Sequence, residues 1–187
     1  MEKPTLTKAL KGKQWIPVFA PAFFESVQLG EVLASDPSLL VGRTISASLT
    51  DLTGDPGRYY VKLFFRISSV QGNRAETVFF GHDCTMDFIS RIVQLRTQRI
   101  DTNEVIQLKD GKVRIKTITV TNGKVSGQLD KLIRKTAADM IREELSKLTI
   151  EEFIKKFSSG EVQGIIRDAL NKLYPTRAFE IRKSRVL

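Results

Sequence analysis

Hydrophobic and polar residues alternate through much of the first two thirds of the chain, a period that is typical of strands with one buried face. Residues 43–50 and 60–70 both show this alternation. Gly72-Asn73 follows the second of these segments, and both residues tolerate the positive φ angles of a two-residue turn. We therefore expect a β-hairpin whose returning strand spans residues 75–81.

A second hairpin is expected around Asp110-Gly111, with strands over residues 105–109 and 113–121. The apolar positions of the later strand change phase near Lys116-Thr117, which indicates a β-bulge there. Several antiparallel strands joined by short turns favour a small barrel or a strongly coiled sheet.

Helical spacing replaces the alternation in the last third of the chain. One earlier helix is expected between the hairpins, over residues 85–96, with Thr85 as its N-cap. Apolar residues then recur at intervals of three and four over 128–148, and Thr149-Ile150-Glu151-Glu152 has the spacing of a capping box for a short helix. A further helix over 162–173 should end before Pro175, and residues 177–186 alternate weakly, as a final strand would.

The expected fold class is α+β, with an antiparallel β-barrel that has an inserted helix, followed by about three C-terminal helices and a final strand. A basic N-terminal arm is expected at residues 1–14. Residues 15–187 should form a single compact domain, because no Pro/Gly/Ser-rich linker separates its parts. Within that domain we expect mainly barrel at 15–125, helices at 126–175 and a basic tail or strand at 176–187.

The charge of the chain indicates the kind of partner that it binds. Lysine and arginine outnumber aspartate and glutamate by 30 to 21, which gives the 187-residue chain a formal charge of +9. The excess is concentrated at residues 1–14, 91–124 and 172–187, whereas residues 15–57 are acidic. A polyanionic partner is therefore expected, with nucleic acid ahead of a membrane surface. No apolar run reaches the roughly 18 residues that a membrane-spanning helix needs.

Catalytic chemistry has little support in the sequence. Cys84 is the single cysteine, which excludes a disulfide framework and thiolate-rich zinc sites. Gly81-His82-Asp83-Cys84 could hold a nucleophile or a metal ligand, and Asp51 with Asp55 could form a carboxylate pair, but both segments are more typical of turns. Phosphate-cradling and nucleophile-elbow motifs are absent from the sequence. No enzyme, catalytic residue, cofactor or metal is expected.

Separate clusters of basic residues are the candidate RNA contacts, since phosphate binding sums many contacts. Most phenylalanines fall at apolar-periodic positions and are expected in the core, whereas Trp15 and Tyr59 could stack on bases. The candidate RNA-binding residues are Lys3, Lys8, Lys11, Lys13, Trp15, Arg91, Arg96, Arg99, Lys131, Arg134, Lys135, Arg177, Arg182, Lys183 and Arg185.

Short motifs follow one another in a specific order along nearly the whole chain. They are Lys13-Gln14-Trp15, Ala20-Pro21, Phe24-Glu25, Leu29-Gly30, Gly42-Arg43, Asp51-Leu52-Thr53-Gly54-Asp55, Gly81-His82-Asp83, Lys109-Asp110-Gly111, Ile133-Arg134-Lys135, Tyr174-Pro175-Thr176-Arg177 and Glu180-Ile181-Arg182-Lys183-Ser184-Arg185-Val186. In their order and spacing the chain resembles the archaeal and eukaryotic small-subunit ribosomal protein family S-one-e, also called S-three-A-e. Its length is similar to that of the archaeal members.

The resemblance implies a cytoplasmic, ribosome-bound structural component of the small ribosomal subunit, on the platform near the mRNA exit. The partners that it implies are small-subunit ribosomal RNA, neighbouring small-subunit ribosomal proteins and mRNA near the exit, with no membrane partner and no catalytic activity. From the residues alone, two alternatives stay open. One is a free-standing translation regulator that binds single-stranded RNA through Trp15 or Tyr59, and the other is an enzyme that uses His82, Asp83 and Cys84.

Overall fold

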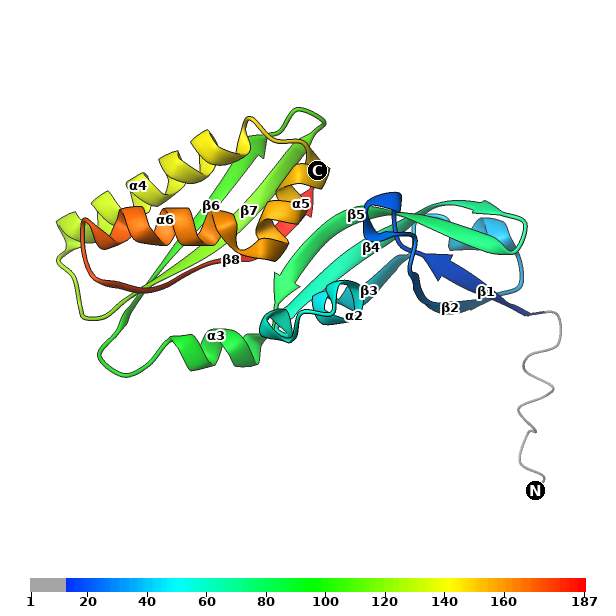
Figure 1. Ribbon diagram of the computed structural model, residues 1–187, viewed down its shortest axis with the longest axis horizontal. Coiled ribbons are helices and arrows are strands. Elements are labelled where there is room, and N and C mark those ends of the chain that lie inside the picture. Colours follow the sequence, from blue (N-terminus) through cyan, green and yellow to red (C-terminus); the bar gives the residue numbers. More distant parts are fainter. Residues whose placement is uncertain (1–12) are drawn as a thin grey trace, which may run out of the picture. The chain divides into compact units, whose positions relative to one another are not determined.

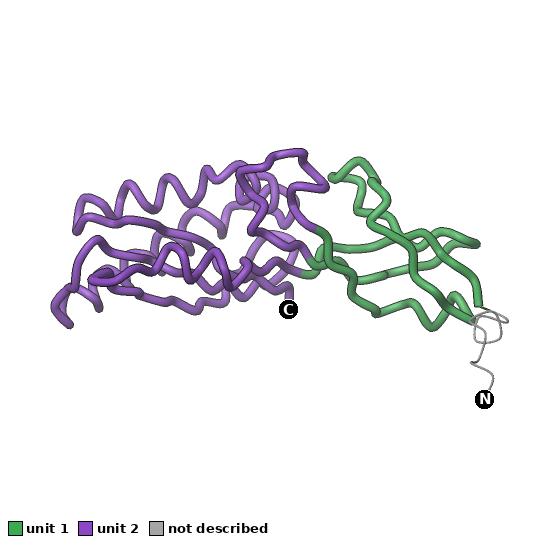
Figure 2. The backbone as a smooth tube through the Cα atoms, turned by 90° about the horizontal axis from the view of Figure 1, so that it is seen from below, with its two compact units in different colours: residues 1–47, 64–80 green, residues 48–63, 81–187 purple. Residues whose placement is uncertain are grey.

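The computed structural model describes residues 13–187, so the arm expected at residues 1–14 lies almost wholly outside the described residues. The chain divides into two compact units (Figure 2). The first unit holds the described part of residues 1–47 together with 64–80, and the second holds residues 48–63 together with 81–187.

The described residues form eight strands and five α-helices (Figure 1), with three short 3-10 helices at Ala22–Phe24, Pro37–Leu40 and Pro56–Arg58. The strands are β1 (Gln14–Phe19), β2 (Gln28–Ala34), β3 (Thr44–Ser48), β4 (Val61–Gln71), β5 (Arg74–Cys84), β6 (Gln98–Gln107), β7 (Lys112–Thr121) and β8 (Thr176–Val186). The helices are α2 (Leu49–Thr53), α3 (Met86–Ile92), α4 (Gly127–Leu145), α5 (Ile150–Ser159) and α6 (Glu161–Asn171). The expected α+β class is confirmed.

The first unit is a small curled part of the sheet around an apolar core. β1 pairs antiparallel with β2 and parallel with β5, where Val18 lies opposite Ala75. Ile16 and Val18 of β1 and Ile67 of β4 are buried together in its core, because alternate residues of each strand point to the same side, and Leu40 packs with them from the short 3-10 helix Pro37–Leu40.

The first predicted hairpin is confirmed as β4 and β5, joined at Gly72-Asn73, with Gly72 at a φ of +60°. The strand expected over residues 43–50 ends instead at Ser48, and residues from Leu49 onward form α2. Gly54 ends this helix at a φ of +71°, where its N–H donates to the carbonyl of Thr50. The glycine that follows this short helix ends it. The alternating pattern of the preceding residues therefore does not reveal that the strand is followed by a helix.

The second unit is a layer of helices packed on strands β6, β7 and β8. α4 and α6 lie on one side of these strands and α3 lies on the other (Figure 1). The second predicted hairpin is confirmed, with Gln107 opposite Lys112 across its turn. The capping box before α5 is also confirmed, because the Thr149 side chain accepts from the Glu152 N–H and the Glu152 carboxylate accepts from the Thr149 N–H.

The final strand is confirmed as β8, and it occupies the centre of the second unit. β8 pairs antiparallel with β7 along its whole length and with the end of β5, where His82 lies opposite Ser184. A segment from the C-terminal end of the chain therefore separates β5 from the hairpin that follows it in sequence.

The bulge expected near Lys116-Thr117 is present, but the extra residue belongs to β8. Lys116 lies opposite Lys183 and Thr117 lies opposite Ile181, which leaves Arg182 as the bulged residue. β7 itself stays in register with β6 throughout. Its apolar phase changes because β7 is buried on both faces from Thr117 onward.

The expected barrel is not supported. In the part of the chain that the structure describes, the main strand order is β2-β1-β5-β8-β7-β6, with β3 and β4 attached through β5, and the sheet does not close. The insertion of β8 explains the difference, because local hairpin signals do not reveal which distant strand will pair with their outer edges.

The helix expected over residues 85–96 begins as predicted, with Thr85 as N-cap, but it ends at Ile92. A polar loop replaces its last turn. The Thr97 hydroxyl accepts from the Gln94 N–H and donates to the Gln94 carbonyl, and Arg96 has a φ of +68°.

Candidate nucleic-acid interface

A row of basic side chains lies along β7, on the face that points away from α4. Lys112, Arg114 and Lys116 are exposed, whereas the alternating Val113 and Ile115 are buried. Side chains of a strand point alternately to its two faces, so these three basic residues share one face.

A second basic row lies beside the first, on β8. The register places Arg185 directly opposite Arg114 and Lys183 directly opposite Lys116. Ser184, between them, points to the helix side, where its hydroxyl contacts His82. We call the surface formed by Lys112, Arg114, Lys116, Lys183 and Arg185 the basic sheet face.

Each of these two pairs therefore places two positive charges directly opposite each other on neighbouring strands. Like charges at directly opposite positions destabilise a sheet. On the β5 side of the basic sheet face, the Lys183 ammonium lies 2.7 Å from the Asp83 carboxylate, which compensates part of this repulsion. Across β7 on the other side, Lys116 faces Asn103 and Arg114 faces Val105, which are neutral.

Arg182, at the bulge, points to the same side of the sheet as the basic sheet face. Its Nη2 lies 4.0 Å from the Met86 sulfur, at the start of α3. Its Nε is buried and has no hydrogen-bond partner among the described residues. Arg182 and Lys116 also line a hollow of about 420 Å³ beside the edge strand β6.

The other predicted arginines of this region are held in contacts within the chain. Arg99 and Asp101 form a two-pronged ion pair, with N···O distances of 2.9 and 2.6 Å. Arg134 donates to the Asp101 carbonyl at 2.7 Å and to the Asp130 carboxylate at 3.1 Å. Arg134 therefore covers the exposed edge of β6, whereas Arg99 is paired with Asp101 of its own strand.

The remaining predicted RNA contacts are spread over other surfaces. Lys131 and Lys135 are exposed on α4, in the helical layer. Arg91 pairs with Asp87 on α3, and Arg177 donates to the Gln94 side chain at 2.5 Å. Arg96 is exposed in the loop after α3.

Of the predicted residues near the N-terminus, Lys3, Lys8 and Lys11 lie outside the described residues, and Lys13 is exposed. Trp15 in the first unit has 56% of its surface exposed, and Tyr59 in the second unit has 52%. Phenylalanines are largely in the core, as expected.

The sequence reasoning missed the three basic residues of β7. Lys112, Arg114 and Lys116 lie within the basic segment 91–124, yet they were not among the candidates. A usable signal was present, because they occupy alternate positions of a predicted strand whose other face is apolar.

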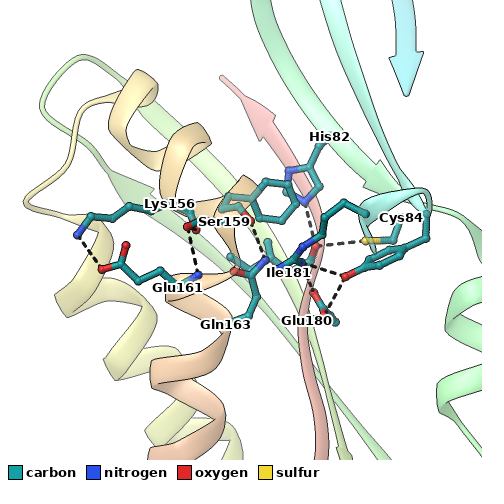
Figure 3. Close-up of polar contacts among 11 residues, drawn as sticks. His82, Cys84, Lys156, Ser159, Glu161, Gln163, Glu180 and Ile181 are labelled. Atoms are coloured by element: carbon teal, nitrogen blue, oxygen red, sulfur yellow. Dashed lines mark hydrogen bonds and ion pairs between the residues drawn. The ribbon is translucent and has the colours of Figure 1, made fainter. Parts of the chain in front are cut away.

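His82 does not lie in a turn, contrary to expectation. It sits within β5 and is fully buried (Figure 3). Its Nδ1 lies 2.6 Å from the Ser184 hydroxyl, its Nε2 lies 2.9 Å from the Ile181 carbonyl, and its ring stacks on Phe157 of α5. Burial lowers the pKa of His82 to about 4. These contacts make His82 a neutral core residue.

The other candidate catalytic groups are also structural. Cys84 is buried with its thiol 3.5 Å from the Ile181 carbonyl, and burial raises the pKa of this thiol. The Asp55 carboxylate accepts from the Gly57 N–H at 2.8 Å, which confirms the expected turn chemistry. In the described part of the chain, no three His, Cys, Asp or Glu side chains gather as a metal site would require.

A buried ionic cluster lies under α3. The Tyr60 hydroxyl donates to Glu180 at 3.1 Å and accepts from Arg58 at 3.0 Å. Burial raises the pKa of the Glu180 carboxyl, and the nearby Arg58 acts in the opposite direction. Tyr60 stacks on Phe88 of α3, so this cluster fixes α3 to the sheet.

None of the described helices is both long enough and apolar enough to span a membrane.

Comparisons with known proteins agree on one family. The model of the ribosomal S3Ae family matches residues 2–187. The chain is 33% identical over 178 residues to small ribosomal subunit protein eS1 of Methanobrevibacter smithii, covering 95% of this chain and 92% of that protein. It is 34% identical over 178 residues to the protein of the same name from Desulfurococcus amylolyticus, covering 95% of this chain and 84% of that protein. It is 33% identical over 184 residues to small ribosomal subunit protein eS1 of Saccharolobus islandicus, covering 98% of this chain and 88% of that protein.

Proposed function

Because the chain belongs to the ribosomal S3Ae family, we propose that it is a structural constituent of the small ribosomal subunit and that it binds ribosomal RNA. Proteins that match it over nearly their whole length carry the name small ribosomal subunit protein eS1. A ribosome-bound location follows from this assignment.

The observation that best supports RNA binding is the basic sheet face. Lysine and arginine side chains gather there on two neighbouring strands, and cations of this kind neutralise phosphates and release the counterions around them. We propose no catalytic role, since His82 and Cys84 are buried and hydrogen-bonded within the core.

A finer placement is part of the same proposal. The resemblance of the motifs favours the platform near the mRNA exit, with neighbouring ribosomal proteins and mRNA as further contacts. The acidic segment 15–57 suits a surface that faces protein or solvent, because phosphates would repel it.

The salt dependence of binding tests the proposed mechanism. If about 6–10 phosphates are contacted, affinity of the purified protein for small-subunit rRNA should fall by about three to five decades between roughly 50 and 200 mM salt. Equal affinity at both salt concentrations would contradict phosphate neutralisation as the basis of binding.

A further inference from the structure

We infer that the basic sheet face binds the phosphate backbone of double-helical RNA, without recognising the bases. This inference rests on the proposed function and names the class of RNA that the surface takes. It involves Lys112, Arg114 and Lys116, which were not among the RNA contacts predicted from the sequence.

Charge on the basic sheet face is arranged in a way that does not favour stability. Lys116 opposes Lys183 and Arg114 opposes Arg185, although an acid at either position of each pair would stabilise the sheet. Among the described residues, Lys112, Arg114 and Lys116 form no ion pair. A local choice that works against stability at an exposed site indicates selection for another purpose.

The composition of the basic sheet face indicates the kind of partner that it binds. Protein interfaces usually place apolar residues at their centre and charges at the rim. Here the centre is charged, and the exposed apolar neighbours lie at its margin: Val105 on the edge strand, opposite Arg114, and Met86 beside Arg182. A partner that offers closely spaced negative charge and no apolar surface fits this pattern, and a nucleic-acid backbone has that chemistry.

The basic sheet face offers no platform for base stacking. Sheets that bind single-stranded RNA present aromatic side chains on which the bases stack. None of the described residues of β6, β7 and β8 that face away from α4 is aromatic. They are Arg99, Asp101, Asn103, Val105, Gln107, Lys112, Arg114, Lys116, Ile118, Val120, Ala178, Glu180, Arg182, Lys183 and Arg185.

The spacing of the basic side chains suits several neighbouring phosphates rather than a single point contact. Residues two apart on β7 are spaced by about 6.8 Å, and the row on β8 lies about 4.8 Å away. Helices α4 and α6 support the opposite side of these strands, so the charges stand on a rigid surface (Figure 1). Double-stranded RNA is recognised mostly by its shape and its phosphates, which such a surface can contact.

The test compares a protein that carries both Arg114→Gln and Lys116→Gln with a matched control. The control carries Lys155→Gln and Lys172→Gln, which remove the same charge from exposed positions of the helical layer. Binding of each full-length protein to a fully paired RNA of about 16 base pairs, and to one of its single strands, is measured over a range of salt.

We expect the R114Q/K116Q protein to lose at least tenfold in affinity for the duplex at low salt. The slope of log affinity against log salt should become shallower by about two, one for each phosphate contact removed. The control should keep the slope of the unchanged protein, and the single strand should bind more weakly than the duplex.

Three results would overturn the inference. They are an unchanged salt slope for R114Q/K116Q, a preference of the unchanged protein for the single strand, and normal duplex binding by a R114Q/K116Q protein that no longer enters small subunits. The last result would assign the face to a protein neighbour. If the unchanged protein still sediments with small subunits in these cases, the proposed function stands and only the inference fails.

Discussion

Lys116 on β7 lies directly opposite Lys183 on β8, and both side chains point away from the helices that cover the other side of the sheet. The Asp83 carboxylate, 2.7 Å from the Lys183 ammonium, partly offsets their repulsion. The arrangement joins two properties of the protein, because it weakens the sheet slightly while concentrating positive charge on an open surface.

Removing one charge of this pair should therefore stabilise the protein while weakening its binding to RNA. For Lys116→Gln we expect the free energy of unfolding to rise by about 0.5 kcal/mol, since Lys116 is exposed and no packing is lost. Urea denaturation at low salt measures the change. A clear loss of stability would show that Lys116 supports the fold.

His82 should make stability depend on pH. Burial lowers its pKa from 6.5 to about 4. Between these two pH values His82 therefore binds a proton in the unfolded chain but stays neutral in the folded protein. The free energy of unfolding should therefore fall as the pH decreases from 6.5 towards 4, by about 3 kcal/mol in all. Above pH 6.5 this contribution is complete.

The matched measurement is urea denaturation of the unchanged protein and of His82→Gln between about pH 7 and 4. Glu180, whose pKa is raised, acts in the opposite direction, but it is present in both proteins and cancels in the difference. The difference in stability between the two proteins should shrink as the pH falls. Parallel pH curves would contradict a neutral, buried His82.

Gly81 lies where the backbones of β5 and β8 approach each other closely. A Cβ atom at this position would collide with the carbonyl oxygen of Ser184, which is backbone and cannot move away cheaply. Gly81→Ala should destabilise the protein by more than about 3 kcal/mol. The control is Gly127→Ala at the first turn of α4, where nothing lies within 4 Å and alanine favours the helix. Equal melting temperatures for the two variants would contradict this close pairing.

The two units should unfold together, as the single domain expected from the sequence requires. Their boundary falls inside β4 and β5, and each of these strands is continuous through both units. Trp15, the only tryptophan, reports on the first unit by fluorescence, whereas circular dichroism reports mainly on helices α4, α5 and α6 of the second. We expect coincident urea transitions. Two separate midpoints would show independent domains.

Local signals in the sequence predicted local structure well. The Gly72-Asn73 turn, the Asp110-Gly111 turn and the capping box at Thr149 each depend on residues within a few positions of one another, and all three are present. The α+β class and the final strand followed from such signals. They could not reveal that β8 would enter between β5 and β7, because that pairing joins segments far apart in the chain.

The same limit applies to the candidate RNA interface. Arg182, Lys183 and Arg185 were selected because they are close together in sequence. Arg114 and Lys116 become their neighbours only through the register of β7 against β8. Other selected residues, such as Arg99 and Arg134, turn out to be engaged with Asp101 at the edge of β6.

The central claim, that the protein is a constituent of the small ribosomal subunit, is tested most directly by sedimentation. A native lysate is separated on a sucrose gradient, and the protein is located with an antibody against it. It should sediment with small subunits and move to the top of the gradient after treatment with ribonuclease. If it stays at the top of the untreated gradient, with the free proteins, the claim is wrong.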